Sequence, residues 1–245
     1  MAYIYDKIRE KFHRKGMSVM ARSQLLKDAV EGKVSIQNIL MRLKVILSDL
    51  KNENIMNWVN GELQGYNDDD LLPTYRVFKG NVIGNYLINY TVQYNLQPVP
   101  LQHLISKEQI DEISTLRITD GISTVQNILQ GERRENYARV IPTEYSHAIS
   151  TEAIQIAGMR VLVPSNRLDG IVSQVKSKLI DVIMELEKEF NNLDELDIRS
   201  QVEESTTITN FNNIIENIIY DESIKIGDKN KIEKTSLGHL FGNNK

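Results

Sequence analysis

The densest group of carboxylates in the chain is the run Asp68, Asp69 and Asp70. Adjacent carboxylates could bind a divalent cation, which prefers oxygen ligands. A calcium loop, however, needs oxygen ligands at alternate positions and a bidentate glutamate further on, and no such spacing follows Asp70. The run lies between Gly65 and Pro73, where polar turn residues are common. The sequence therefore predicts a solvated joint between a helix and a strand, and no metal site.

Other residue types that could do chemistry are scattered along the chain. The four histidines, none spaced to bind zinc from one helix face, are His13, His103, His147 and His239. The absence of cysteine excludes disulfides, thiol nucleophiles and cysteine-ligated zinc. The motifs of serine hydrolases, P-loop enzymes and dinucleotide-binding enzymes are also absent. We therefore expect no cofactor and favour a protein that is not an enzyme, although a site assembled from distant residues stays an alternative.

Composition narrows the class of protein further. The chain has 245 residues, of which 41% are hydrophobic and 25% charged, as in ordinary globular proteins. A net charge of -4 argues against broad nucleic-acid binding, which needs a basic surface, so we expect no nucleic-acid partner. No apolar run is long enough to span a bilayer, and no signal peptide is evident. These features predict a cytoplasmic protein without a transmembrane segment.

Three helices are predicted before the acidic run. The first ends at Gly32, and the second begins after Ser35, a good N-cap residue. Apolar residues recur in the second at steps of three and four from Ile36 to Leu50, which predicts one buried face. The third helix ends at Gly65. Together they predict a helical layer.

The hydrophobic period changes after the acidic run. Alternating residues over 86–94 predict a strand, with residues 74–84 as its partner. Gly84 with Asn85 predicts a type II′ turn between them, and Gly80 with Asn81 predicts either a bulge or an alternative turn. Helices are predicted from residue 106 and over 120–131, a buried strand over 158–164 and a long helix over 166–190. Strands bracketed by helices predict an α+β fold, with the helical layer packed on a small antiparallel sheet.

Both ends of the chain differ from this body. Residues 1–19 form an amphipathic segment that either binds an anionic membrane surface or packs on the body, and we favour the second. Residues 193–207 are predicted to form a polar linker. Residues 208–245 are a β-prone tail rich in isoleucine and asparagine. The tail must dock on its own body, pair with other copies or stay disordered until it binds. We favour assembly into a homo-oligomer through Ile214, Ile218, Ile224, Ile226 and Ile232.

Residues 20–192 resemble the AbiTii domain. The resemblance rests on "LLKDAVEG", on "ILMRLKVILSDLKNENIMNWVNGELQGY" with the "LPTYR" that follows, and on "MRVLVPSNRLDGIVSQVKSKLIDVIMELEKEF". That domain takes its name from a subunit of a two-gene lactococcal abortive-infection system. The resemblance implies a role in antiphage defence, in which an infected cell stops growing or dies before phage is released. It implies no known catalytic residues.

The resemblance also changes which residues matter at the joint. The acidic run is a variable linker between two matching motifs, whereas Glu62, Tyr66, Tyr75 and Arg76 lie within them. We expect an Arg–Glu pair that locks a helix to a strand. The function that we predict is antiphage defence through self-assembly or through binding of a second defence protein or a phage protein. The alternatives are an enzyme effector, such as a nuclease or a nucleotide-consuming enzyme, and a membrane-acting toxin.

Overall fold

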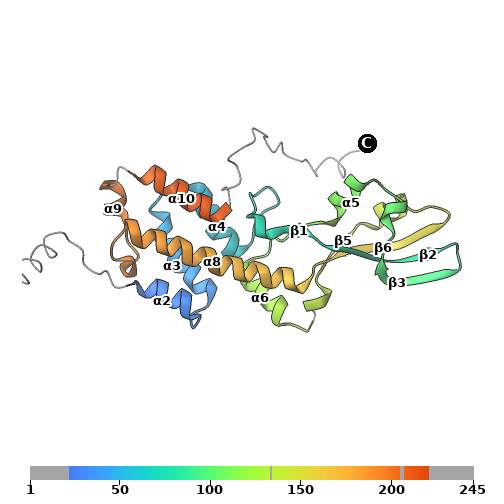
Figure 1. Ribbon diagram of the computed structural model, residues 1–245, viewed down its shortest axis with the longest axis horizontal. Helices are drawn as coiled ribbons and strands as arrows, with labels where there is room; N and C mark the ends of the chain where they lie inside the picture. Colours follow the sequence, from blue (N-terminus) through green and yellow to red (C-terminus); the bar gives the residue numbers. More distant parts are fainter. Residues whose placement is uncertain (1–21, 133, 205–206, 221–245) are drawn as a thin grey trace, which may run out of the picture.

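The computed structural model describes residues 22–132, 134–204 and 207–220. The molecule is elongated, with most of its helices at one end and the strands β2, β3 and β6 extending to the other (Figure 1). The α+β class predicted from the sequence is confirmed. The long helices lie beside the inner end of the sheet and leave its outer half free of them (Figure 1).

The helices are α2 (Gln24–Glu31), α3 (Ile36–Ser48), α4 (Glu53–Gln64), α5 (Lys107–Ser114), α6 (Ile122–Gln130), α7 (Thr143–Ala148), α8 (Ser165–Glu189), α9 (Arg199–Glu204) and α10 (Ile208–Tyr220). The strands are β1 (Val77–Lys79), β2 (Asn81–Ile88), β3 (Val92–Pro98), β4 (Thr115–Arg117), β5 (Ala138–Ile141) and β6 (Ile154–Leu162). Short 3-10 turns are η1 (Thr74–Arg76), η2 (Leu101–His103), η3 (Arg134–Asn136) and η4 (Leu193–Glu195). None of the helices in these ranges is long and apolar enough to cross a bilayer.

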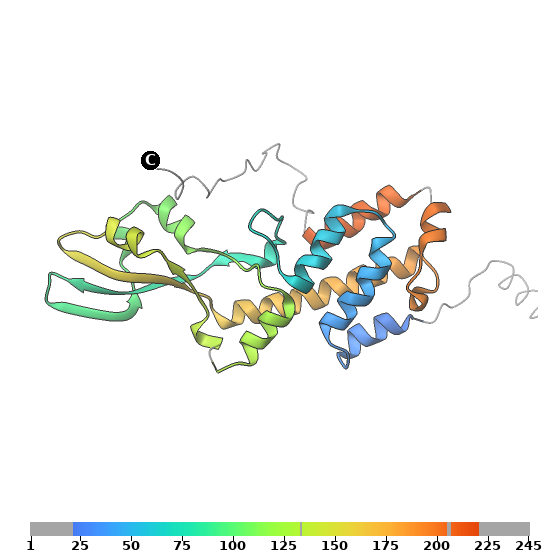
Figure 2. The same cartoon turned by 180° about the vertical axis from the view of Figure 1, so that it is seen from behind.

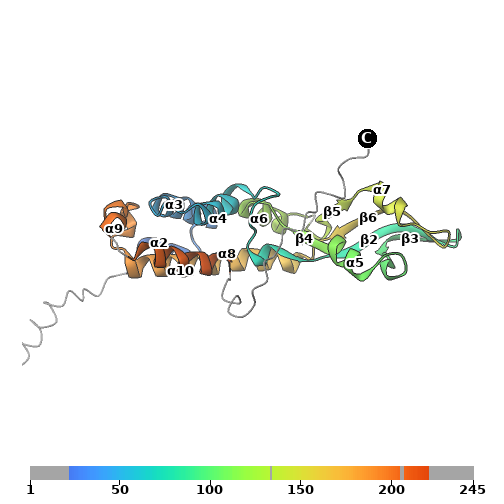
Figure 3. The same ribbon diagram turned by 90° about the horizontal axis from the view of Figure 1, so that it is seen from above.

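The helical end has two layers. In the view from above, α3, α4 and α6 form one layer, and α2, α8 and α10 form the other (Figure 3). The three helices predicted before the acidic run are confirmed, and each begins at a side chain that accepts a backbone N–H: Ser23, Ser35 and Asn52. The long helix α8 buries an apolar stripe along its length, which makes it the central element of this end.

The sheet is antiparallel throughout. Its four-stranded part has the order β3-β2-β6-β5, and β1 pairs separately with β4. Only Gly80 separates β1 from β2, so the two strands form one kinked path that leads from the helical end into the sheet. A side chain at Gly80 would place its Cβ 2.7 Å from the carbonyl O of Leu162, and therefore only glycine fits there.

The predicted hairpin turn at Gly84 and Asn85 is wrong. Strand β2 continues through both residues, and the turn lies at residues 89–91. Asn89 and Tyr90 have positive φ angles of 48° and 59°, and the amide of Thr91 donates to the carbonyl O of Ile88, as in a type I′ turn. Gly84 is needed instead for close strand contact, because a Cβ there would lie 2.5 Å from the carbonyl O of Gly158.

The segment after α8 is not the polar linker that the sequence predicted. Leu193 and Ile198 are buried in the core, and α9 forms within the segment. The carboxylate of Asp194 accepts a hydrogen bond from the amide of Gln24 at 2.9 Å, at the start of α2. The two buried apolar side chains and the hydrogen bond between Asp194 and the start of α2 hold the segment against the helical end.

The β-prone interpretation is also wrong for residues 208–220, which form helix α10. Phe211, Ile215 and Ile219 recur at steps of four and are buried. Viewed from behind, α10 lies along the helical end, where it contacts α4 and α8 (Figure 2). Packing of this stripe outweighs the strand preference of isoleucine and asparagine. The predicted segments 1–19 and 221–245 lie outside the described residues.

Candidate functional site

The joint residues that the sequence singled out lie in one buried cluster. Arg76 donates to both carboxylate oxygens of Glu62, through Nε at 2.8 Å and through a terminal nitrogen at 2.5 Å. The hydroxyls of Tyr66 and Tyr75 also donate to Glu62, at 2.9 and 2.7 Å. Glu62 and Arg76 are both 0% exposed. Helix α4 is thereby linked to η1, the turn that opens β1.

Further contacts complete the hydrogen bonding of Arg76. Its other terminal nitrogen donates to the carbonyl O atoms of Ile118 and Asp120, at 2.9 and 2.8 Å. Its guanidinium also lies 5.1 Å from the centre of the Tyr66 ring. A buried ion pair is stable only when such additional hydrogen bonds satisfy its remaining donors and acceptors. The pair therefore ties three chain segments together, namely α4, η1 and the segment after β4.

The electrostatics of the cluster keep Arg76 charged and its tyrosines neutral. Burial opposes the charge of Arg76, but the hydrogen bonds and the negative charge of Glu62 outweigh it and raise the pKa of Arg76 above its ordinary value. Burial, followed by the charge of Glu62, raises the pKa of both Tyr66 and Tyr75. Solvent does not reach Glu62 or Arg76, so these two side chains are closed to a substrate.

The acidic run occupies the turn that the sequence predicted. Asp68 and Asp69 are exposed, and the carboxylate of Asp70 accepts from the backbone amide of Asn67 at 2.7 Å. Within the described residues, no group of three or more histidine, aspartate or glutamate side chains is arranged to hold a metal ion. The carboxylates of the run thus form a local turn.

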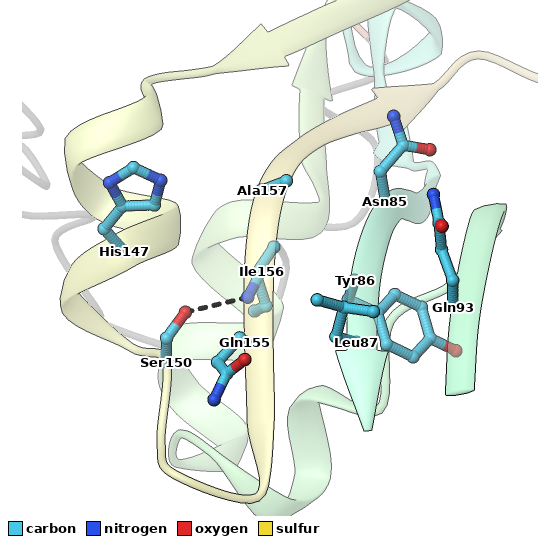
Figure 4. Close-up of a pocket in the computed structure, with 9 residues that line it drawn as sticks. All are labelled: Asn85, Tyr86, Leu87, Gln93, His147, Ser150, Gln155, Ile156 and Ala157. Atoms are coloured by element: carbon cyan, nitrogen blue, oxygen red, sulfur yellow. Dashed lines mark hydrogen bonds between the residues drawn. The ribbon is translucent and has the colours of Figure 1, made fainter. Parts of the chain in front are cut away.

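A hollow of about 450 Å³ lies on one face of the sheet, between α7 and the β2–β3 hairpin (Figure 4). Leu87 is paired with Gln93 of β3 and with Gln155 of β6, so these three side chains project from the same face. Both ladders of β2 shift register next to Asn85. Such bulges bend a strand and redirect its side chains, which explains why the sheet is hollowed at this point.

The chemistry of the hollow suits uncharged polar groups. Its lining contains no Asp, Glu, Lys or Arg and consists of Asn85, Tyr86, Leu87, Gln93, His147, Ser150, Gln155, Ile156 and Ala157. Side-chain amides both donate and accept hydrogen bonds, as peptide groups do. The hydroxyl of Ser150 accepts from the amide of Ile156 and donates to the carbonyl O of Ser146, both at 2.9 Å. It is therefore committed to the backbone and is not paired with His147 as a nucleophile would be.

Of the five predicted assembly residues, the structure describes Ile214 and Ile218. Ile214 is 46% exposed, and Ile218 is half-buried against the core. The carbonyl O of Ile218 accepts from Nζ of Lys178 at 2.6 Å, which binds the last turn of α10 to α8. Ile224, Ile226 and Ile232 lie outside the described residues.

The sequence contained a signal for the sheet end that motif searches do not detect. Residues 80–106 include no Asp, Glu, Lys or Arg, although such residues make up 25% of the chain. No other uncharged run in the sequence is half as long. This run covers β2, β3 and η2, and it supplies four residues of the hollow. The other five come from residues 147–157, which no local motif connects to the run.

Comparison with known proteins identifies the family. The model of the AbiTii family matches residues 22–211, which extends from the start of the described chain into the first turn of α10. The match thus includes the buried cluster, the hollow and the segment that connects α8 to α10. No curated protein and no solved structure matches the chain. Because the family model covers most of its length, the chain belongs to the AbiTii family.

Proposed function

We propose that this protein acts in abortive-infection defence against phage by binding another protein at the outer end of its sheet. The family suggests the defence role. The chemistry of the hollow supports protein binding, because its lining offers amides and apolar side chains with no charged group. Interfaces between proteins are depleted of charge at their centre. The hollow at the sheet end is concave and has no charged side chain in its lining.

Exposed apolar side chains at the sheet end support the same proposal. Leu87 in the hollow is 36% exposed, Tyr90 at the hairpin turn 68%, and Val92 and Leu96 on β3 48% and 51%. Leu87 and Val92 project from opposite faces of the hairpin, which carries no charged residue. A partner that covers the tip of the hairpin would bury these apolar side chains. Assembly through residues 221–245 stays a separate prediction, since those residues lie outside the described ranges.

A plaque assay tests the proposal. Cells that carry the native locus should form fewer phage plaques than cells from which this gene is deleted, over a panel of phages. The change Leu87→Asp places a charge in the hollow and should restore plaques. Val140→Asp, on the exposed strand β5 of the same sheet, is the matched control and should still protect. Equal plaque numbers with and without the gene would refute the defence role.

Comparison of the wild type with Leu87→Asp tests the binding surface separately from the defence role. If the wild type protects and Leu87→Asp protects equally well, the defence role stands but the sheet end is not the binding surface. Circular dichroism of the purified variants must match the wild type, so that a loss of protection is not a loss of fold. Leu87 is partly exposed on an open face of the sheet, so the substitution should cost little stability.

A further inference from the structure

We propose that the outer edge of β3 pairs with β3 of a second copy of this chain, so that two sheets join into one. Strand β3 is the terminal strand of the order β3-β2-β6-β5, and one of its edges pairs with no strand of the described chain. Backbone N–H and C=O groups along such an edge form a template for another strand. The inference deepens the proposed function, because it names the partner.

The side chains of β3 lack the usual protection of an edge strand. Natural edges are commonly blocked by lysine or other charged residues. Strand β3 reads VQYNLQP and is exposed at every position except the half-buried Tyr94. The opposite edge strand, β5, carries Arg139 in its centre. The β5 edge of this sheet therefore carries a charged residue that opposes pairing with another strand, whereas the β3 edge carries none.

The local geometry limits the pairing to the first part of β3. The ladder between β2 and β3 shifts register between Gly84 and Tyr86, and Leu96 has a positive φ of 52° where β3 bulges. Pro98 at the end of β3 has no N–H to donate. Residues 92–95 therefore form the regular edge. The stacked rings of Tyr86 and Tyr94, 4.8 Å between centres, hold this segment against β2.

A second copy fits this edge better than a charged partner does. In a two-fold interface the same surface patch of each copy faces the other. An edge with charges of one sign would therefore face like charges and be repelled. Gln93 and Asn95 are exposed, and their side chains both donate and accept hydrogen bonds, so the edge is complementary to itself. The uncharged run over residues 80–106 removes like-charge repulsion across the whole hairpin.

Light scattering coupled to size-exclusion chromatography tests the pairing on the purified full-length protein. The wild type should contain an even number of subunits. Gln93→Lys puts two lysines into the joined edge and should halve that number at the same protein concentration. Val140→Lys adds the same charge to the opposite edge strand, where Val140 is 76% exposed, and should leave the number unchanged. Circular dichroism checks that both variants fold.

Single cysteines locate the contact, since the natural chain has none. In an antiparallel pair, opposite residues that exchange no hydrogen bonds have Cα atoms about 4.5 Å apart, which is within the Cα separation that a disulfide spans. Cysteine placed in turn at Val92, Gln93 and Asn95 should cross-link two chains efficiently at the position nearest the two-fold axis. Cysteine at Val140 should give no such cross-link. The disulfide needs an added oxidant such as oxygen, which accepts the two electrons and two protons.

Four results would overturn the inference. Three are a monomeric wild type, a subunit number that Gln93→Lys leaves unchanged, and cross-linking no stronger at β3 than at Val140. The fourth is loss of assembly in a chain that ends after residue 220, which should keep the wild-type subunit number; that loss would assign the contact to residues 221–245 instead. All of these measurements use purified protein. Their failure would therefore leave the defence role, which the plaque assay tests, unaffected.

Discussion

Replacement of Arg76 by methionine should destabilise the protein severely. Methionine keeps much of the volume of the side chain but donates no hydrogen bond. The carboxylate of Glu62 would stay buried with two tyrosine hydroxyls and no cation, and the carbonyl O atoms of Ile118 and Asp120 would lose their donor. Removal of one partner from a buried ion pair costs about 3–5 kcal/mol.

A loss of that size is large beside the total stability of a domain, which is about 5–15 kcal/mol. A change of about 4 kcal/mol raises the ratio of unfolded to folded molecules roughly a thousandfold. The double variant Glu62→Gln with Arg76→Met removes both charges. Its loss should therefore fall short of the sum of the two single losses by at least about 1 kcal/mol. Arg117→Met removes an exposed arginine from β4 and should cost less than about 0.5 kcal/mol.

Urea unfolding followed by tryptophan fluorescence measures these losses. Trp58 is the single tryptophan, is 0% exposed, and donates from its ring nitrogen to the hydroxyl of Tyr75 at 3.0 Å. Its emission therefore reports on the cluster itself, and circular dichroism reports on the whole fold. A loss below about 1 kcal/mol for Arg76→Met, or additive single losses in the double variant, would refute the view that the pair locks α4 to the sheet.

Three further predictions concern helix α10, the acidic run and the buried tyrosines. Ending the chain after residue 207 removes the buried stripe of α10 and should cost more than about 4 kcal/mol in urea unfolding, whereas ending it after Tyr220 should cost almost nothing. Asparagine at all three positions 68–70 should change stability by less than about 0.5 kcal/mol and leave plaque protection intact; lost protection with unchanged unfolding would revive the metal site. The two buried tyrosines Tyr66 and Tyr220 should not change the free energy of unfolding below about pH 10, and above it each should lower that free energy by about 1.4 kcal/mol per pH unit, since burial raises the pKa of Tyr66 and raises that of Tyr220 to about 12. The fall occurs because unfolded tyrosines lose their protons near pH 10 while the folded ones keep them, and a flat pH profile would show that these side chains are solvated.

The sequence predicts those parts of the fold whose signals are local. The apolar stripe of α3, the N-cap Ser35 and the stop at Gly32 act within a few residues, and the structure reproduces them. The capping box at Ser106 is likewise local and is present. Local physical chemistry decides such elements before any tertiary contact forms.

Elements that depend on distant contacts were predicted wrongly or missed. Ile215 and Ile219 suit a strand or a helix equally well on their own, and only α4 and α8 decide between them. Gly84 carries a turn signal, but its function is close contact with Gly158, 74 residues away in a strand not recognisable as its neighbour. The hollow has no local sequence signal for the same reason. Its residues converge from β2, β3, β6 and the end of α7.

The claim of abortive-infection defence is tested most directly by growth of infected cultures at two ratios of phage to cells. At a low ratio, a culture with this gene should keep growing after a culture without it has lysed, because the few infected cells release no phage. At a high ratio, where every cell is infected, growth of the culture with the gene should stop and few phage should be released. A culture that lyses and releases phage equally with and without the gene at both ratios would contradict the claim.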